Sequence, residues 1–213
     1  MVARFDVAGL PSRTLLIACG ALAREIVDLR AMHGWPHLAL RCLPAELHNR
    51  PEAIPEAVRR VIRAHRERFA RQYVVYADCG TGGRLDRVCA EEGAERIAGA
   101  HCYEFYAGAQ AFAAWHDDEP GTFYLTDFLL RHFDRLVVGA LGLDRHPSLR
   151  DAYFGRYRRL LYLAQREPDA AARAQARAAA ERLGLALEVR HTGYGELGAS
   201  LARVAERAVA WRH

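Results

Sequence analysis

Residues 73–92 read YVVYADCGTGGRLDRVCAEE, and this stretch decides the fold class. Its first five residues, YVVYA, are β-branched, aromatic or small, which predicts a buried strand. The glycine-rich loop at 80–83 predicts a turn, and residues 84–92 have the apolar spacing of a helix. A strand joined to a helix by a short glycine-rich loop is the repeating unit of a parallel α/β fold.

The same alternation of short apolar runs and longer amphipathic runs extends along the whole chain. Besides 73–77, strands are predicted at 14–18, 38–43, 96–98, 158–164 and 185–190. Besides 84–92, helices are predicted at 21–33, 51–72, 103–116, 168–183 and 196–212. Residues 120–142 begin like a strand and continue like a helix. We therefore expect one α/β domain spanning 1–213, with a mainly parallel, Rossmann-like sheet flanked by helices and an N-terminal extension at 1–13.

Composition excludes several kinds of chemistry. All 30 basic residues are arginine, because the sequence contains no lysine. A Schiff-base lysine, a lysine nucleophile and the lysine of a phosphate-binding P-loop are thus excluded. The formal net charge of only +4, with acidic residues interleaved among the arginines, gives no indication of a nucleic-acid partner.

The cysteine count indicates the redox environment. Five cysteines, an odd number in a chain of 213 residues, argue against a disulfide framework and for a reducing compartment. No stretch approaches the roughly 20 apolar residues of a membrane span, so no membrane partner is expected. These features predict a cytoplasmic protein.

Cysteine and histidine residues follow the first four predicted strands. Cys19 follows the first strand, His48 the second, Cys79 the third and Cys102 the fourth. Ligands bind at the carboxyl edge of parallel sheets, where these positions meet. We therefore expect the four side chains to converge, whereas Cys89, inside a predicted helix, and Cys42, in a predicted strand, are expected to be structural.

Three thiolates and an imidazole drawn from separate loops are typical of metal binding. A Cys₃His set suits tetrahedral Zn²⁺, and three cysteines alone can hold an iron–sulfur cluster with one iron open to substrate. Close Cys-x-x-Cys pairs are absent. The metal site, with zinc as the first choice and an iron–sulfur cluster as the second, therefore depends on the predicted topology.

Other polar residues at the same edge have further candidate roles. The loop residues Gly80, Thr81, Gly82 and Gly83 would bind an anion through backbone N–H groups, with a simple tight turn as the alternative. Glu104 would orient a ligand histidine or act as a general base. A cysteine-nucleophile hydrolase built from Cys79 and His101 is a further alternative, which leaves Cys19 and Cys102 without a role.

The residues also resemble a known family. The motifs that carry the likeness are residues 16–19 (LIAC), 47–51 (LHNRP), 78–83 (DCGTGG), 101–102 (HC) and 121–126 (GTFYLT). In order and spacing they are similar to the bacterial and archaeal family called domain of unknown function 1638, over about 14–195. Its recurring polar positions correspond here to Cys19, His48, Cys79 and Cys102. Some members are encoded near corrinoid-dependent methyltransferases, so the resemblance implies a link to methyl transfer or its supporting metal chemistry.

These observations lead to two functional expectations. The first is a metal-binding protein with a small-molecule substrate, which supports a corrinoid methyltransferase system. The second is a non-catalytic carrier of a small molecule, corrinoid or metal, in which the cysteines are structural. The apolar helices and the aromatic-rich stretch 123–133 also favour a homodimer.

Overall fold

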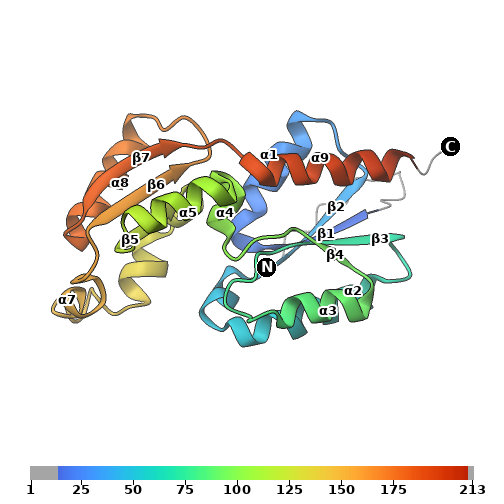
Figure 1. Ribbon diagram of the computed structural model, residues 1–213, viewed down its shortest axis with the longest axis horizontal. Helices are drawn as coiled ribbons and strands as arrows, with labels where there is room; N and C mark the ends of the chain where they lie inside the picture. Colours follow the sequence, from blue (N-terminus) through green and yellow to red (C-terminus); the bar gives the residue numbers. More distant parts are fainter. Residues whose placement is uncertain (1–13, 211–213) are drawn as a thin grey trace. The chain divides into compact units, whose positions relative to one another are not determined.

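The protein is described by a computed structural model that covers residues 14–210, with side chains to residue 208. The N-terminal extension expected at 1–13 lies outside the described residues. The chain divides into two compact units, each with its own sheet (Figure 1). Unit 1 contains the described residues up to Cys102 and those from Glu196 onward, and unit 2 is Tyr103–Gly195.

Unit 1 has a four-stranded parallel sheet in the order β2-β1-β3-β4. Its strands are β1 (Thr14–Cys19), β2 (Leu38–Leu43), β3 (Arg71–Val75) and β4 (Glu95–Arg96). Its helices are η1 (Gly20–Leu22), α1 (Ala23–Met32), η2 (Ala45–Asn49), η3 (Pro51–Ala53), α2 (Ile54–His65), α3 (Arg84–Glu92) and α9 (Gly195–Ala210). The central strand β1 places Leu16 between Leu40 of β2 and Tyr73 of β3.

The core of unit 1 lies on both faces of this sheet. Helices α1 and α9 cover one face, and α2 and α3 cover the other (Figure 1). Leu16 and Ile17 of β1 point to opposite faces and are fully buried, as are Ile26 of α1 and Val58 of α2. Because both faces are covered, β1 is apolar almost throughout, as expected for a central parallel strand.

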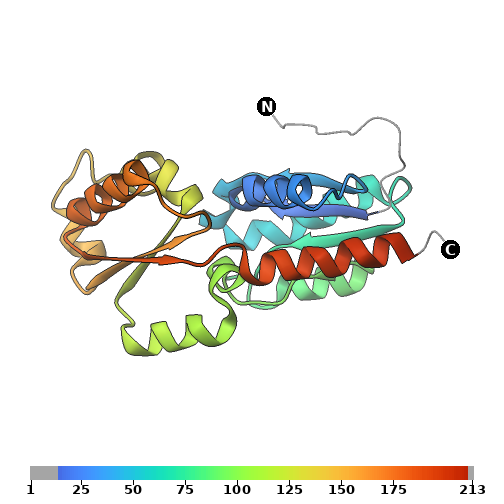
Figure 2. The same ribbon diagram turned by 90° about the horizontal axis from the view of Figure 1, so that it is seen from above.

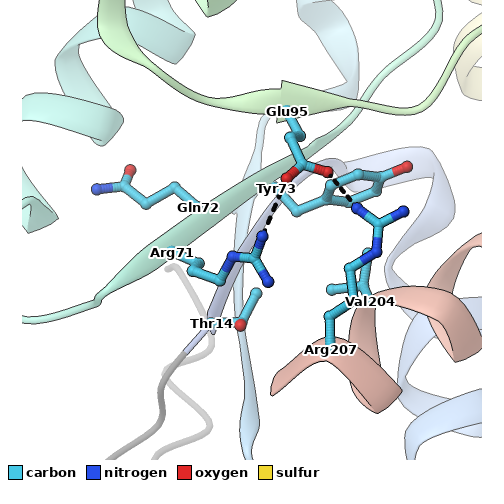
Figure 3. A pocket seen from close by; sticks show the side chains of 7 residues that line it. All are labelled: Thr14, Arg71, Gln72, Tyr73, Glu95, Val204 and Arg207. Atoms are coloured by element: carbon cyan, nitrogen blue, oxygen red, sulfur yellow. Dashed lines mark hydrogen bonds and ion pairs between the residues drawn. The ribbon is translucent and has the colours of Figure 1, made fainter. Parts of the chain in front are cut away.

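Helix α9 returns to the first sheet from the end of the chain (Figure 2). The Tyr73 hydroxyl and the Ser200 hydroxyl are 2.7 Å apart. A small hollow nearby, at the amino ends of β1, β3 and β4, is lined by Arg71, Glu95 and Arg207 (Figure 3). Glu95 pairs with Arg71 at 3.2 Å and with Arg207 at 2.9 Å. Glu95 thus bridges the two arginines and ties α9 to the amino edge of the sheet, the edge opposite the predicted cysteine site.

Unit 2 has a three-stranded parallel sheet in the order β5-β6-β7. Its strands are β5 (Thr122–Thr126), β6 (Arg159–Ala164) and β7 (Ala186–His191). Its helical segments are α5 (Ala109–Asp118), α6 (Asp127–Arg131), the π-helical turn η4 (Asp134–Gly139), α7 (Leu149–Phe154) and α8 (Ala170–Leu183); α4 (Cys102–Ala107) begins at the last residue before this unit. Leu125 and Leu160 pack with α6, η4, α7 and α8 on one face, while Tyr124 and Leu161 pack with Phe112 of α5 on the other.

The predicted class, a parallel α/β fold flanked by helices, is confirmed, but the strands form two sheets instead of one. The prediction that the chain behaves as a single domain stays a prediction. The helix expected at 51–72 ends at His65, because residues 71 and 72 join the sheet beside β1. The helix expected at 103–116 is interrupted at Gly108, which has φ +79°, and the short helix α7 was not predicted.

No helix in the described part of the chain is both long and apolar enough to cross a membrane.

Candidate thiol site

The turn between β3 and α3 presents Cys79 in an unusual backbone conformation. Cys79 has φ +49°, and it is the one non-glycine residue with positive φ among the described residues. The left-handed region costs an L-residue roughly 1–2 kcal/mol. The Cys79 N–H donates to the Ala100 carbonyl at 2.9 Å, and the preceding Asp78 N–H donates to the Gly99 carbonyl at 2.9 Å. These two bonds hold the turn against the segment that leads into α4.

The Asp78 side chain stabilises the turn by hydrogen bonds to the residues that follow Cys79. Its carboxylate accepts hydrogen bonds from the Thr81 hydroxyl and from the N–H groups of Gly82 at 3.0 Å and Gly83 at 2.9 Å. Burial alone would raise the pKa of Asp78, but these three bonds and nearby Arg96 lower it below its usual value. The ionised carboxylate thus fixes the loop that carries Cys79.

Three donors converge on the sulfur of Cys79. The Cys102 thiol, the Cys102 backbone N–H and the His48 imidazole all hydrogen-bond to it. The Cys102 thiol and His48 together hold the pKa of Cys79 well below its usual value, although burial opposes this. The hydrogen bond to Cys79 raises the pKa of His48 in turn. The two pKa shifts favour a thiolate on Cys79 beside an imidazolium on His48, with the Cys102 thiol as a second donor.

The remaining thiols near this pair are neutral. Burial raises the pKa of Cys19 to about 11 and that of Cys42 to about 11. Cys19 also accepts a hydrogen bond from the backbone of Ala21 and interacts electrostatically with Cys79. The hydroxyl of Tyr76, whose residue is only 2% exposed, lies close to Cys19, and burial raises its pKa strongly. The charge in this cluster is therefore concentrated on Cys79.

The two members of the pair differ in exposure. His48 lies on η2 and is exposed, whereas Cys79 retains 8% of its accessible surface. Gly80 is exposed directly after Cys79, and within the described residues its N–H makes no hydrogen bond.

The structure brings together the four residues predicted for a metal site, Cys19, His48, Cys79 and Cys102, at the carboxyl edge of the first sheet. Their arrangement differs from a coordination sphere. No three His, Cys, Asp or Glu side chains in the described part of the chain are placed to hold one metal ion together. Instead, Cys102 and His48 donate hydrogen bonds to Cys79.

The other predicted site residues have separate surroundings. Asp78 already accepts hydrogen bonds from the N–H groups of Gly82 and Gly83, whereas the Gly80 N–H is unused in the part of the chain that the structure describes, so anion binding by residues 80–83 stays a prediction beside the tight-turn alternative. His101 is exposed, and the imidazole that contacts Cys79 is that of His48. Glu104 lies on α4 in unit 2. Catalytic roles for His101 and Glu104 stay predictions.

Sequence reasoning missed two contributors to the site. For Asp78 the sequence does carry a signal, because an Asp three to five residues before Thr81, Gly82 and Gly83 is typical of a turn capped by a side chain. Tyr76 falls in a predicted strand, and the sequence gives no comparable signal for it. Its proximity to Cys19 depends on the pairing of β3 with β1, which the sequence does not display.

Fold and site define a parallel α/β protein with a hydrogen-bonded cysteine–histidine pair at the carboxyl edge of its first sheet. The chain belongs to the family described as a protein of unknown function (DUF1638), whose model matches residues 42–201. The match confirms the resemblance noted from the sequence. It contains His48, Cys79 and Cys102, whereas Cys19 lies before it. No curated protein and no solved structure matches the chain.

Proposed function

We propose that the protein is an enzyme in which Cys79 attacks the carbonyl carbon of a small acyl substrate. The observation that carries this proposal is the convergence of three hydrogen-bond donors on the Cys79 sulfur. A cysteine paired with an imidazole is an activated nucleophile. The left-handed backbone of Cys79 at a strand-to-helix turn adds support, because strained residues cluster at active sites and nucleophiles often sit on such turns.

The residues around Cys79 supply each step of acyl transfer. The thiolate adds to the carbonyl carbon, and the oxygen takes up the negative charge beside the unused Gly80 N–H. The His48 imidazolium then gives its proton to the leaving group, and a thioester to Cys79 remains. Neutral His48 next removes a proton from water as the water oxygen attacks the thioester carbon. Collapse of this intermediate breaks the C–S bond and releases the acid, which leaves the Cys79 thiolate beside the His48 imidazolium and so restores the starting pair.

An activated ester tests this proposal without knowledge of the natural substrate. The full chain is mixed with p-nitrophenyl acetate at pH 7, and the intact mass and the acetylated peptide are determined. We expect a stoichiometric burst of p-nitrophenolate and one acetyl group on Cys79. The Cys79→Ser variant should lose the burst, whereas Cys89→Ser should keep it, because burial raises the pKa of Cys89 to about 11. Equal acetylation in the two variants would refute the proposal.

A metal centre is the second candidate function, and one observation favours it. Cys19, Cys79 and Cys102 interact electrostatically within one cluster, so each negative charge raises the pKa of the neighbouring thiols. A soft cation would offset this repulsion and is the kind of ion that several thiolates bind. Zinc remains the first choice and an iron–sulfur cluster the second, with Cys19, His48, Cys79 and Cys102 as the ligands. If the protein binds a metal at this site, it would either support corrinoid-dependent methyl transfer or act as a carrier of a small molecule, corrinoid or metal.

Metal content decides between the two candidates. Anaerobically purified protein is analysed for zinc, iron and sulfide per folded chain, with Cys79→Ser and Cys89→Ser compared directly. If the metal centre is correct, wild type and Cys89→Ser hold stoichiometric metal and Cys79→Ser loses most of it, since a hydroxyl is a poor ligand for soft ions. Metal at the same level in both variants, or no stoichiometric metal in wild type, would exclude this centre.

A further inference from the structure

Cys102 differs from the other cysteines in its relation to Cys79. Its thiol and its backbone N–H both hydrogen-bond to the Cys79 sulfur. The two backbones are also held side by side, because Asp78 and Cys79 donate to the carbonyls of Gly99 and Ala100 at 2.9 Å each. All five cysteines are free thiols in the structure. Cys79 and Cys102 are therefore in contact and supported by adjacent main chain.

We propose that Cys79 and Cys102 form a redox pair, which a hydroperoxide closes into a reversible disulfide that switches the site off. The inference rests on the proposed nucleophilic role of Cys79 and on the main-chain bonds that hold Cys79 beside the segment leading into Cys102, because a sulfur nucleophile that attacks carbonyl carbon also attacks peroxide oxygen. It adds a chemical role for Cys102, which acyl transfer does not need beyond its hydrogen bonds.

The oxidation proceeds in two balanced steps. The Cys79 thiolate attacks the terminal oxygen of the hydroperoxide, the O–O bond breaks, and the departing alkoxide takes the proton of the His48 imidazolium to become an alcohol. Cys79 is then a sulfenic acid, and the peroxide has gained two electrons. The Cys102 sulfur next attacks the Cys79 sulfur, the S–O bond breaks, and hydroxide leaves with the Cys102 proton as water. A dithiol reverses the reaction by exchange.

The arrangement selects Cys102 over the other thiols as the second partner. Cys19 interacts with Cys79 electrostatically, but its own hydrogen bond comes from the Ala21 backbone. Cys89 is buried in α3, where its charged neighbours are Arg96 and Asp86. Among the described cysteines, Cys102 is the one whose thiol hydrogen-bonds to the Cys79 sulfur. Cys79 is buried and retains 8% of its accessible surface, so hydrogen peroxide, the smallest hydroperoxide, is the oxidant chosen for the test.

Thiol counting and intact mass test this inference on the full chain. Reduced protein is treated with one equivalent of hydrogen peroxide, quenched, and its free thiols are titrated under denaturing conditions. We expect free thiols to fall from five to three per chain, a mass lower by two hydrogens, and one cross-linked peptide joining Cys79 to Cys102. Dithiothreitol should return all five thiols.

Matched variants identify the two cysteines that form the cross-link. Cys102→Ser should show no cross-link and should instead gain oxygen on Cys79, whereas Cys89→Ser and Cys19→Ser should still form the cross-link. A cross-link between another pair, or no thiol loss in wild type, would overturn the inference. Acetylation by p-nitrophenyl acetate is followed in the same samples. Acetylation without disulfide refutes the redox pair alone, and disulfide without acetylation refutes acyl transfer alone.

Discussion

Replacement of His48 by alanine tests the thiolate–imidazolium pair directly. A hydrogen bond to a charged group contributes about 1.5–3 kcal/mol, and one pKa unit corresponds to about 1.4 kcal/mol. Because His48 is exposed, solvent screening favours the lower end of that range, about 1.5 kcal/mol. His48 stabilises the charged form of Cys79, so its removal should raise the pKa of Cys79 by about one unit.

The assay is the rate of Cys79 alkylation by iodoacetamide as a function of pH, followed by peptide mass. Only the thiolate reacts, so the rate rises through the pKa of Cys79. Wild type should react at Cys79 well below pH 8, and the His48→Ala midpoint should lie about one unit higher. Cys89 is the internal reference, because its buried thiol should stay unreactive across this range.

His48→Asn refines the result, because asparagine keeps a hydrogen-bond donor and loses the positive charge. An intermediate midpoint is expected. A midpoint that is the same in wild type and His48→Ala, with both proteins folded, would refute the reasoning and leave Cys102 as the sole source of the low pKa.

Three other predictions concern the framework of the site. Asp78→Ala should lower the free energy of unfolding by about 1–3 kcal/mol through lost hydrogen bonds. The folded-state pKa of Asp78 is lowered, so in urea melts this loss should appear at neutral pH and vanish as pH falls through that pKa, below about 3.9. Gly20→Ala should cost about 1–3 kcal/mol, since a Cβ there would lie 2.9 Å from the Leu43 carbonyl oxygen; an unchanged urea midpoint would contradict this contact. Leu16→Ala should cost about 2–5 kcal/mol in the same melts, because Leu16 is fully buried in the sheet, and a smaller cost would mean that β1 is not central.

Much of the local structure could be predicted because it depends on neighbouring residues. The strand at 38–43 and the helix at 84–92 have the predicted bounds. Alternation of apolar residues sets these elements, and the glycine at position 93, with φ +70°, ends the helix. The pairing of strands that are distant in the sequence could not be predicted in this way. The division into two sheets depends on β5 pairing with β6 instead of with the first four strands, and no local pattern encodes that choice.

The location of the candidate site could be predicted for a similar reason. Parallel strands bring their carboxyl ends to one edge, so residues that follow β1, β2 and β3 must lie near one another. The bonding within the cluster could not be predicted this way. The choice of His48 over His101 as the partner of Cys79 depends on how η2 turns back over the sheet edge, which is a matter of three-dimensional packing.

The backbone at Cys79 connects stability with chemistry. The glycines at 80, 82 and 83 all have positive φ, so the turn is built for residues without a side chain. A cysteine at 79 costs roughly 1–2 kcal/mol there, and the bonds of Asp78 hold the strained conformation. In this conformation the sulfur interacts with His48 and with the thiol and backbone N–H of Cys102. A side chain that costs stability in a glycine-rich turn is explained by what its sulfur does, and a thiolate with three donors is suited to attack an electrophile.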